Sequence, residues 1–301
     1  MTRPTPLFDT ALIRRRLTRA RRAGYAGFLV ERALDDLDDR LGAVLRRFDT
    51  ALDLATPVPG LAARLQGNGR VGTVVRLSPV AEETGGVRLV GDPETLPFGG
   101  ADTFDLAVSL LALQHVNDLP GTLVQLRRAL NPDGLFVGCL LGGSTLTELR
   151  QSFVQAESEL EGGVSPRVAP FAEVRDLGGL LQRAGFALPV TDSETVTVRY
   201  ADPFALMRDL RAMGLTNALT ERRRTPLRRE TLLRAAALYA ERFADPDGRL
   251  RATFELIWLS GWAPHESQQK PLRPGSARAR LADALGTAEL GASSNEGADR
   301  S

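Results

Sequence analysis

Apolar and polar residues follow two different spacings along this chain. Before residue 48 the apolar residues recur at intervals of three and four, which predicts helix over residues 9–47. From residue 48 onward, short apolar runs alternate with amphipathic segments. The runs predict strands over 50–54, 72–77, 86–90, 104–110 and 134–141. Strands that alternate with helices are typical of α/β proteins, whose sheets are mainly parallel and covered by helices on both faces.

The second half of the chain continues this pattern and predicts how the sheet ends. Residues 171–186 and 203–244 have helical spacing, with breaks near Gly214 and Pro226. Residues 187–192, 195–200 and 252–264 have strand composition. We therefore expect a seven-stranded sheet that is closed by a strand pair on either side of a helical insertion. The final strand should be antiparallel.

These patterns predict one main domain with additions at both ends. Residues 1–47 form an N-terminal helical extension, and residues 48–277 form the domain, with the helical insertion at about 203–250. The segment 278–301 is rich in small and polar residues and predicts a disordered tail that folding does not require.

Composition narrows the compartment and the class of partner. The net charge is +1, so no global field attracts nucleic acid or an anionic membrane. The single cysteine, Cys139, lies in an apolar run and predicts a buried thiol in a reducing compartment. With neither a transmembrane run nor a leader-like segment, a cytoplasmic protein is expected. The basic segment 14–22 and the acidic segment 31–40 are either a solvated helix face with internal charge pairs or a partner or membrane contact.

The segment "ALDLATPVPGLAARL" (51–65) has the outline of a cofactor-binding turn. An apolar strand leads to Asp53, a loop follows, and a helix begins. A nucleotide-type cofactor normally requires glycines in such a loop, so that the backbone can approach the ligand closely. This loop has Ala55 at its start and a glycine, Gly60, only at its end.

Longer motifs carry a resemblance to a known family. The order of elements resembles the class I S-adenosylmethionine (SAM)-dependent methyltransferases. More narrowly, the chain resembles the bacterial branch of the complex I assembly factor 5 family, which is related to the malonyl-carrier-protein methyltransferases of biotin synthesis. The matching segments include "FDLAVS" and "LNPDG" within 96–136, "GGSTLTELR" (142–150), "DLRAMGLTNAL" (209–219), "DGRLRATFELIWLSGW" (247–262) and "HESQQKPLRPGSA" (265–277), with a further match over 161–190.

The resemblance implies a Rossmann-like fold, SAM as the cofactor, and a role in building respiratory complex I. The implied partner is a complex I subunit or an assembly intermediate. In the eukaryotic branch of the family, a complex I arginine is modified, and the modification is described as hydroxylation. Carried over by position, the cofactor-binding residues are Asp53, Ala55, Gly60, Asp92 and Pro93.

The chain departs from the family pattern at the cofactor loop and at the second strand. Pro57 and Pro59 have no amide hydrogen to donate. Arg76 occupies the place of the acid that would accept hydrogen bonds from the ribose hydroxyls, and a guanidinium has no acceptor. Two functions therefore stay open. The chain is either an assembly factor that acts by binding, or an active SAM-dependent methyltransferase or SAM-using modifier of a protein arginine.

No residue is identified as catalytic from the sequence. His115 is a candidate general base, with Gln114 and Asn117 as polar neighbours, or a structural histidine. Glu148 and Arg150 either face the pocket from a lid helix or form an exposed ion pair. His115 and His265 should lie at opposite edges of the sheet, so no metal site is predicted. The segment "HESQQKP" is a candidate partner-contact surface.

Overall fold

The computed structural model describes residues 5–81, 86–98 and 103–269. The chain divides into two units, Met1–His265 and Glu266–Ser301, and the whole sheet belongs to the first. The predicted tail, 278–301, lies outside the described residues, as does the C-terminal motif beyond residue 269. In the described residues, no helix is long and apolar enough to cross a membrane.

One sheet of seven strands forms the centre of the first unit, in the order β3-β2-β1-β4-β5-β7-β6. Its strands are β1 (Phe48–Leu54), β2 (Val71–Ser78), β3 (Val87–Val90), β4 (Phe104–Leu110), β5 (Leu130–Leu141), β6 (Ala187–Tyr200) and β7 (Leu250–Trp262). The first five are parallel, whereas β7 is antiparallel to both β5 and β6. The predicted fold class and the antiparallel final strand are confirmed.

One strand prediction was wrong in detail. The two short strands predicted at 187–192 and 195–200 are a single strand, β6, which pairs with β7 without interruption from Val190 to Tyr200. Its polar residues suggested a break because β6 is the edge strand, and one of its faces is open to solvent. The pattern of alternate exposure along β6 is the signature of such a half-buried strand.

The helices connect and cover these strands. They are α1 (Thr10–Arg22), α2 (Phe28–Gly42), α3 (Gly60–Gly67), η1 (Leu113–His115), α4 (Leu119–Ala129), α5 (Thr147–Glu161), α6 (Val174–Arg183), α7 (Pro203–Ala212) and α8 (Arg229–Phe243). Local sequence sets several of their ends. The Asp118 carboxylate accepts a hydrogen bond from the Gly121 amide at 2.8 Å and caps α4. Beyond α7 the chain turns at Gly214, whose φ is +74°.

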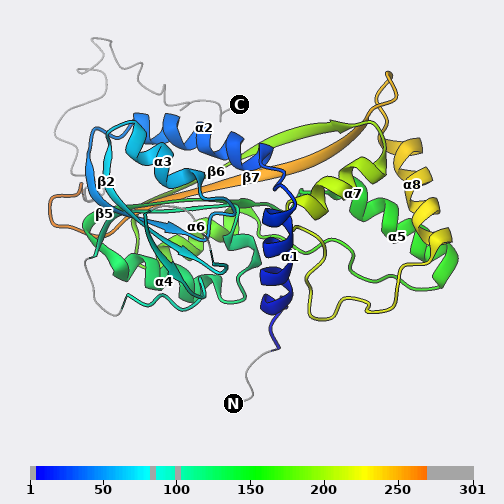
Figure 1. The fold of residues 1–301 in the computed structure, drawn as a ribbon, viewed down its shortest axis with the longest axis horizontal. Coiled ribbons are helices and arrows are strands. Elements are labelled where there is room, and N and C mark those ends of the chain that lie inside the picture. Colours follow the sequence, from blue (N-terminus) through cyan, green and yellow to red (C-terminus); the bar gives the residue numbers. More distant parts are fainter. Residues whose placement is uncertain (1–4, 82–85, 99–102, 270–301) are drawn as a thin grey trace, which may run out of the picture. The chain divides into compact units, whose positions relative to one another are not determined.

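Two hydrophobic layers enclose the sheet (Figure 1). On one face, apolar residues of α2 and α3 pack on residues such as Ala51 and Val74. On the other face, α4 and α6 pack on residues such as Leu52 and Leu77. Successive strand residues thus contribute to opposite layers, as the pleat requires. The helices α5, α7 and α8 contact the long strands β6 and β7.

The residues predicted to be structural lie in this core. Cys139 is fully buried, and burial raises the pKa of its thiol, so the thiol stays protonated. Trp258 is 1% exposed, and the Arg40 guanidinium stacks on its ring at 4.3 Å. Trp262 is partly buried against the same core.

Candidate functional site

The loop after β1 keeps a backbone shape that suits glycine. Ala55 has φ of +59°, a left-handed conformation that glycine adopts freely and alanine does not. The Ala55 amide donates a hydrogen bond to the Leu77 carbonyl at 2.7 Å. The Thr56 amide donates a longer one, of 3.4 Å, to the Asp53 carboxylate. The prolines at 57 and 59 have no amide hydrogen. Within this loop, the amides of Ala55 and Thr56 already have partners inside the protein.

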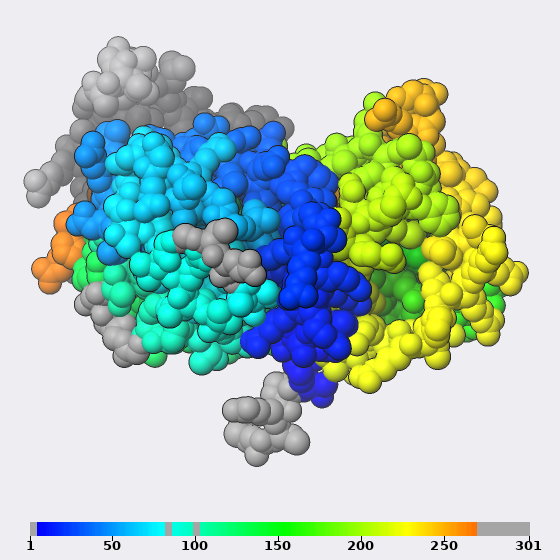
Figure 2. All heavy atoms as spheres, viewed as in Figure 1, coloured from blue at the N-terminus to red at the C-terminus, as the bar shows by residue number. Residues whose placement is uncertain are grey.

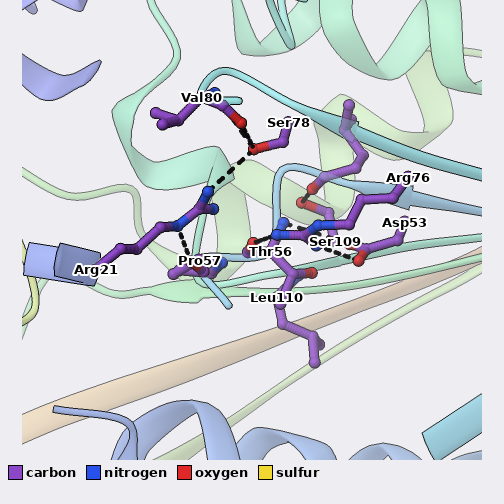
Figure 3. Close-up of polar contacts among 10 residues, drawn as sticks. Arg21, Asp53, Thr56, Pro57, Arg76, Ser78, Val80, Ser109 and Leu110 are labelled. Atoms are coloured by element: carbon purple, nitrogen blue, oxygen red, sulfur yellow. Dashed lines mark hydrogen bonds and ion pairs between the residues drawn. The ribbon is translucent and has the colours of Figure 1, made fainter. Parts of the chain in front are cut away.

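A buried ion pair occupies the space beside this loop (Figure 3). Asp53 and Arg76 face each other across the parallel β1–β2 pair, and both side chains are almost completely buried. Arg76 donates to the Asp53 carboxylate and, at 2.6 Å, to the Thr56 carbonyl. Burial raises the pKa of Asp53, and the Arg76 guanidinium acts against that shift.

This pair changes the chemistry that the edge of the sheet can offer. Arg76 points inward at Asp53 and Thr56, so these donors bind the protein itself. The two side chains compensate each other's charge in a region closed to water. Neither side chain presents an acceptor to the hydroxyls of a bound ribose.

Helix α1 closes the same region from outside through two arginines. Arg21 donates to the Pro57 carbonyl at 2.6 Å and to the Ser78 hydroxyl at 3.4 Å (Figure 3). Arg14 forms an ion pair of 2.8 Å with Asp92, the acid expected near an adenine ring. The N-terminal helix thereby binds the loops that follow β1, β2 and β3, and these are the loops a nucleotide cofactor would contact.

The space left under α1 is small and mostly apolar. The cavity measures about 80 Å³ and includes Ile13, Leu17, Tyr25, Leu111 and Met213 in its lining. Pockets for small molecules and cofactors usually measure roughly 300–1,000 Å³. SAM is of that size class, so the described residues do not fit it. The loop amides are engaged, the ribose acceptor is replaced by Arg76, and the volume is insufficient.

The five residues predicted to bind a cofactor do not form one site. Ala55, Asp92 and Pro93 line the small cavity. Asp53 is sealed beneath it by Arg76. Gly60 begins α3 and lines a separate hollow on the outer side of β2. The geometry thus brings together three of the five residues.

His115 lies where the small cavity meets a second one. Its ring packs edge-on against Phe8, with the ring centres 5.6 Å apart. Desolvation, followed by the charge of Arg16, lowers the pKa of His115 to about 4. A histidine with this pKa is neutral near pH 7 and is a weak general base there.

The polar neighbours of His115 have structural partners. The Gln114 side chain donates to the Leu111 carbonyl at 2.7 Å. The Asn117 side chain accepts from the Phe8 amide at 2.7 Å, and the Asn117 amide donates to Glu94 at 2.8 Å. The bond to Phe8 holds the segment after β4 against the N-terminal segment, and the bond to Glu94 holds it against the loop after β3.

Both interpretations of Glu148 and Arg150 were wrong. Glu148 is buried, and its carboxylate accepts from the hydroxyl and the amide of Thr253 at 2.5 and 3.1 Å. Arg150 donates to the carbonyls of Gly143 and Thr145. The two side chains fasten α5 to β7 and to the preceding loop, and they make no ion pair with each other.

The two histidines lie at opposite edges of the sheet, as expected. His115 follows the carboxyl end of β4. His265 follows β7, whose last residue, Trp262, pairs with Leu135 near the start of β5. Among the residues that the structure describes, no group of three or more metal-binding side chains is found.

A second cavity of about 280 Å³ lies beyond His115, between the sheet edge and helices α5 and α7. Its lining is mainly apolar and includes Leu141, Phe153, Phe171, Met207 and Phe254. Arg167 and Arg211 also line it. This volume is close to the lower limit for ligand pockets, roughly 300 Å³.

Sequence reasoning missed the contribution of α1 and the partner of Arg76. Arg14 and Arg21 are seven residues apart, so they share one helix face, and this spacing was the available signal. The Asp53–Arg76 pair could be found only from strand register, since the two residues are 23 positions apart. Periodicity within single segments does not contain that information.

Comparison of the amino-acid sequence with known proteins identifies the family of this chain. A family model described as a methyltransferase domain matches residues 25–189. The chain is 39% identical over 264 residues to "Arginine-hydroxylase NDUFAF5, mitochondrial" of Rattus norvegicus, covering 85% of this chain and 76% of that protein. It is 41% identical over 176 residues to "Malonyl-[acyl-carrier protein] O-methyltransferase" of Xylella fastidiosa, covering 58% of this chain and 57% of that protein. The match to the Danio rerio NDUFAF5 protein spans 60% of that relative's length.

Solved structures agree at the level of the fold. The putative methyltransferase of Bacillus halodurans has a TM-score of 0.52 at 16% identity, covering 77% of this chain and 99% of that one. Methyltransferase domains generally bind SAM, and this chain has the fold without the loop chemistry. The family resemblance inferred from the sequence is confirmed: the chain belongs to the methyltransferase-domain family and, within it, to the relatives of arginine-hydroxylase NDUFAF5.

Proposed function

We propose that this chain is an assembly factor for respiratory complex I that acts by binding a subunit or an assembly intermediate, and not through SAM chemistry. The observation that carries the proposal is the buried Asp53–Arg76 pair, together with the α1 arginines that close the loop beside it. The proposed setting is the cytoplasm.

The choice of complex I follows from the relatives and from the C-terminal motifs. The rat NDUFAF5 protein matches over 85% of this chain, whereas the malonyl-carrier-protein methyltransferase of Xylella fastidiosa matches over 58%. The motifs "GLTNAL" and "GWAPHESQQKP" lie in the part of the chain that follows the methyltransferase-domain match. They are the motifs on which the resemblance to assembly factor 5 rests.

A second candidate function is modification of a protein arginine. The name of the rat and human relatives, arginine-hydroxylase, favours it. The second cavity, about 280 Å³ with an apolar lining, offers a space in which a protein side chain could lie. Under this alternative the chain is an enzyme, either a SAM-dependent methyltransferase or a SAM-using modifier of arginine.

Calorimetric titration with SAM separates the two candidates. For the unaltered protein we expect no binding at micromolar SAM, because the ion pair and the prolines obstruct the site. Hydrogen bonds to a charged acceptor are worth roughly 1.5–3 kcal/mol, so losing the acid alone weakens binding about 10-fold to 100-fold. Micromolar binding would refute the binding-only proposal and favour the enzyme.

A variant that restores the acid and the loop glycines tests whether these substitutions are what prevents SAM binding. Arg76→Asp combined with Ala55→Gly, Pro57→Gly and Pro59→Gly restores the acid and the flexible loop. This variant should bind SAM more tightly than the parent. The three glycine substitutions alone are the control, since they leave the Asp53–Arg76 pair in place and should bind no more than the parent does.

The cellular role is tested by deleting the gene. Deletion should lower the amount of assembled complex I and its NADH:quinone activity, with biotin synthesis intact. A biotin auxotroph with normal complex I would instead assign the chain to the malonyl-carrier-protein branch.

A further inference from the structure

Helix α1 carries two sets of arginines with different surroundings. Its sequence, TALIRRRLTRARR, holds six arginines and no acidic residue. Arg14, Arg16 and Arg21 bind protein groups: Asp92, the carbonyls of Thr216 and Asn217, and the carbonyl of Pro57, respectively. These bonds fix how the helix is rotated on the sheet edge.

The other three arginines face outward. Arg15, Arg19 and Arg22 are exposed, and they recur at intervals of four and three, so they form one stripe along the helix. Within residues 5–81, 86–98 and 103–269, the structure gives these three guanidinium groups no hydrogen bond or ion pair. Figure 2 shows α1, in dark blue, as a ridge across the visible face.

The acidic helix α2 does not neutralise this stripe. Its carboxylates bind other arginines: Asp35 and Asp38 pair with Arg64, and Asp36 pairs with Arg32. The Arg32–Asp36 pair is an internal charge pair of the kind that the sequence allowed, and among the described residues no ion pair joins segment 14–22 to segment 31–40. Burial, and then the positive charges of Arg222 and Arg19, lower the pKa of Arg16, so this helix lies in surroundings that already hold several cations.

An open hollow of about 840 Å³ runs beside the stripe. Four arginines of α1 line the hollow: Arg14, Arg15, Arg21 and Arg22. Its apolar lining comes from Val58, Pro59, Pro79 and Val80. The hollow thus combines a basic wall with an apolar surface, next to the loop that is closed to a cofactor.

We propose that the Arg15–Arg19–Arg22 stripe and the adjoining hollow dock an acidic, partly apolar peptide segment of a partner protein. This inference rests on the proposed function, because it supplies the partner contact that the function requires. Carboxylates match the guanidinium groups, and apolar side chains of the same segment match the prolines and valines. A single extended chain fits a concave hollow of this kind.

Other anionic partners fit the surface less well. Among the residues of α1, Ala11 is the only exposed one besides the three arginines, so the outward face has no large apolar group to insert into a bilayer. The stripe covers two helical turns, about 10 Å, which spans few phosphates of a nucleic acid. The net charge of +1 gives no wider field to support such binding.

Fluorescence anisotropy on the full chain tests the proposal. The probe is a labelled twelve-residue peptide that alternates glutamate and leucine, and the comparison peptide has lysine in place of glutamate. We expect the acidic peptide to bind, more weakly as salt rises, and the lysine peptide not to bind. Arg15→Gln, Arg19→Gln and Arg22→Gln together should lower the affinity roughly tenfold.

The matched control removes the same charge elsewhere. Arg128, Arg175 and Arg183 are exposed on α4 and α6, and their joint change to glutamine should alter the peptide affinity less than twofold. Equal melting temperatures show that both variants are folded. Equal loss in both variants, or no loss in the stripe variant, overturns the proposal. Stripe-dependent binding to phosphatidylserine vesicles without peptide binding also overturns it, in favour of a membrane.

Complementation of the deletion strain with the variants distinguishes failure of this docking inference from failure of the proposed assembly function. In the deletion strain, the control variant should restore complex I and the stripe variant should not. If deletion leaves complex I unchanged, the proposed function fails, while the peptide measurement still decides whether the surface binds acidic segments. If the stripe variant restores complex I fully, the docking inference fails and the assembly role stands.

Discussion

The two halves of the sheet's carboxyl edge have opposite characters. Over β1 and β2 the edge is closed by a charged pair, Asp53–Arg76, with arginines from α1 above it and a cavity of about 80 Å³. Over β5 and β7 the edge is apolar and holds a cavity of about 280 Å³ under α5 and α7. The same edge thus has a filled half, which a buried ion pair closes, and an open half, which holds the larger and mainly apolar cavity.

This difference shows how two parts of one sheet edge can be closed by different interactions. A buried acid beside a loop designed for close approach needs a partner once no ligand supplies one. Arg76 supplies that partner from within the chain, and its own burial is compensated by the hydrogen bonds that it donates to the Asp53 carboxylate and the Thr56 carbonyl. The lining of the open half is mainly apolar, and Arg167, one of the two arginines in it, is paired with the buried Glu157.

The largest expected effect on stability comes from removing one partner of the Asp53–Arg76 ion pair in the filled half. Arg76→Met leaves Asp53 buried without its partner, and removing one member of a buried pair costs about 3–5 kcal/mol. We expect a melting temperature lower by roughly 10 °C for a domain of this size. Thermal unfolding followed by circular dichroism measures the change.

The control is the double variant Asp53→Leu with Arg76→Met. Replacing a buried pair by apolar residues of similar volume is often neutral. The double variant should therefore recover at least half of the loss. If it is no more stable than Arg76→Met alone, the ion pair is not what stabilises this half.

A smaller effect is expected at the boundary between the halves, where His115 lines both cavities. The pKa of His115 is lowered to about 4 in the fold, whereas an unfolded chain has about 6.5. Between these values the unfolded state binds the proton more readily. The free energy of unfolding should therefore fall as the pH drops from 6.5 toward 4, by at most about 3 kcal/mol.

Denaturant titrations at pH 7.5 and 5 measure this dependence. Because the ring is only partly enclosed, the loss should be nearer half of that upper limit. In His115→Gln the part of the pH dependence that comes from this ring should vanish. An unchanged pH dependence in His115→Gln would show that the ring is solvated and does not separate the two cavities.

The sequence predicted the sheet better than it predicted the edge of the sheet. Strand and helix positions follow from local apolar spacing, and α4 even carries its cap at Asp118. The absence of a ribose acceptor at Arg76 was also visible, because it depends on one residue type. The partner of Arg76 was not visible, since it lies 23 residues away and is selected by strand register.

The role of α1 was missed for a similar reason. Its amphipathic pattern predicts a helix, but three of its arginines are held by loop groups that no local pattern connects to it. Glu148 and Arg150 illustrate the converse case. Two charges close in sequence suggested a pair, whereas each binds the neighbouring backbone or a side chain of β7.

The smallest expected effect concerns the loop itself, and it tests whether the turn retains a glycine shape. Ala55 has φ of +59° and is 5% exposed. Ala55→Gly removes a left-handed alanine, which relieves roughly 1–2 kcal/mol of strain. It also removes a buried methyl group and adds freedom to the unfolded chain, which together cost about 1–2 kcal/mol. The net change in the free energy of unfolding should thus lie near zero. Ala51→Gly is the matched control, because Ala51 is fully buried on β1, just before this loop, and its φ is not positive. The control bears the same costs without the relief, so it should be less stable than Ala55→Gly by about 1–2 kcal/mol. Denaturant unfolding of the two variants gives this difference directly. Equal losses would mean that the backbone at 55 stores no strain and that the turn has no trace of a glycine loop.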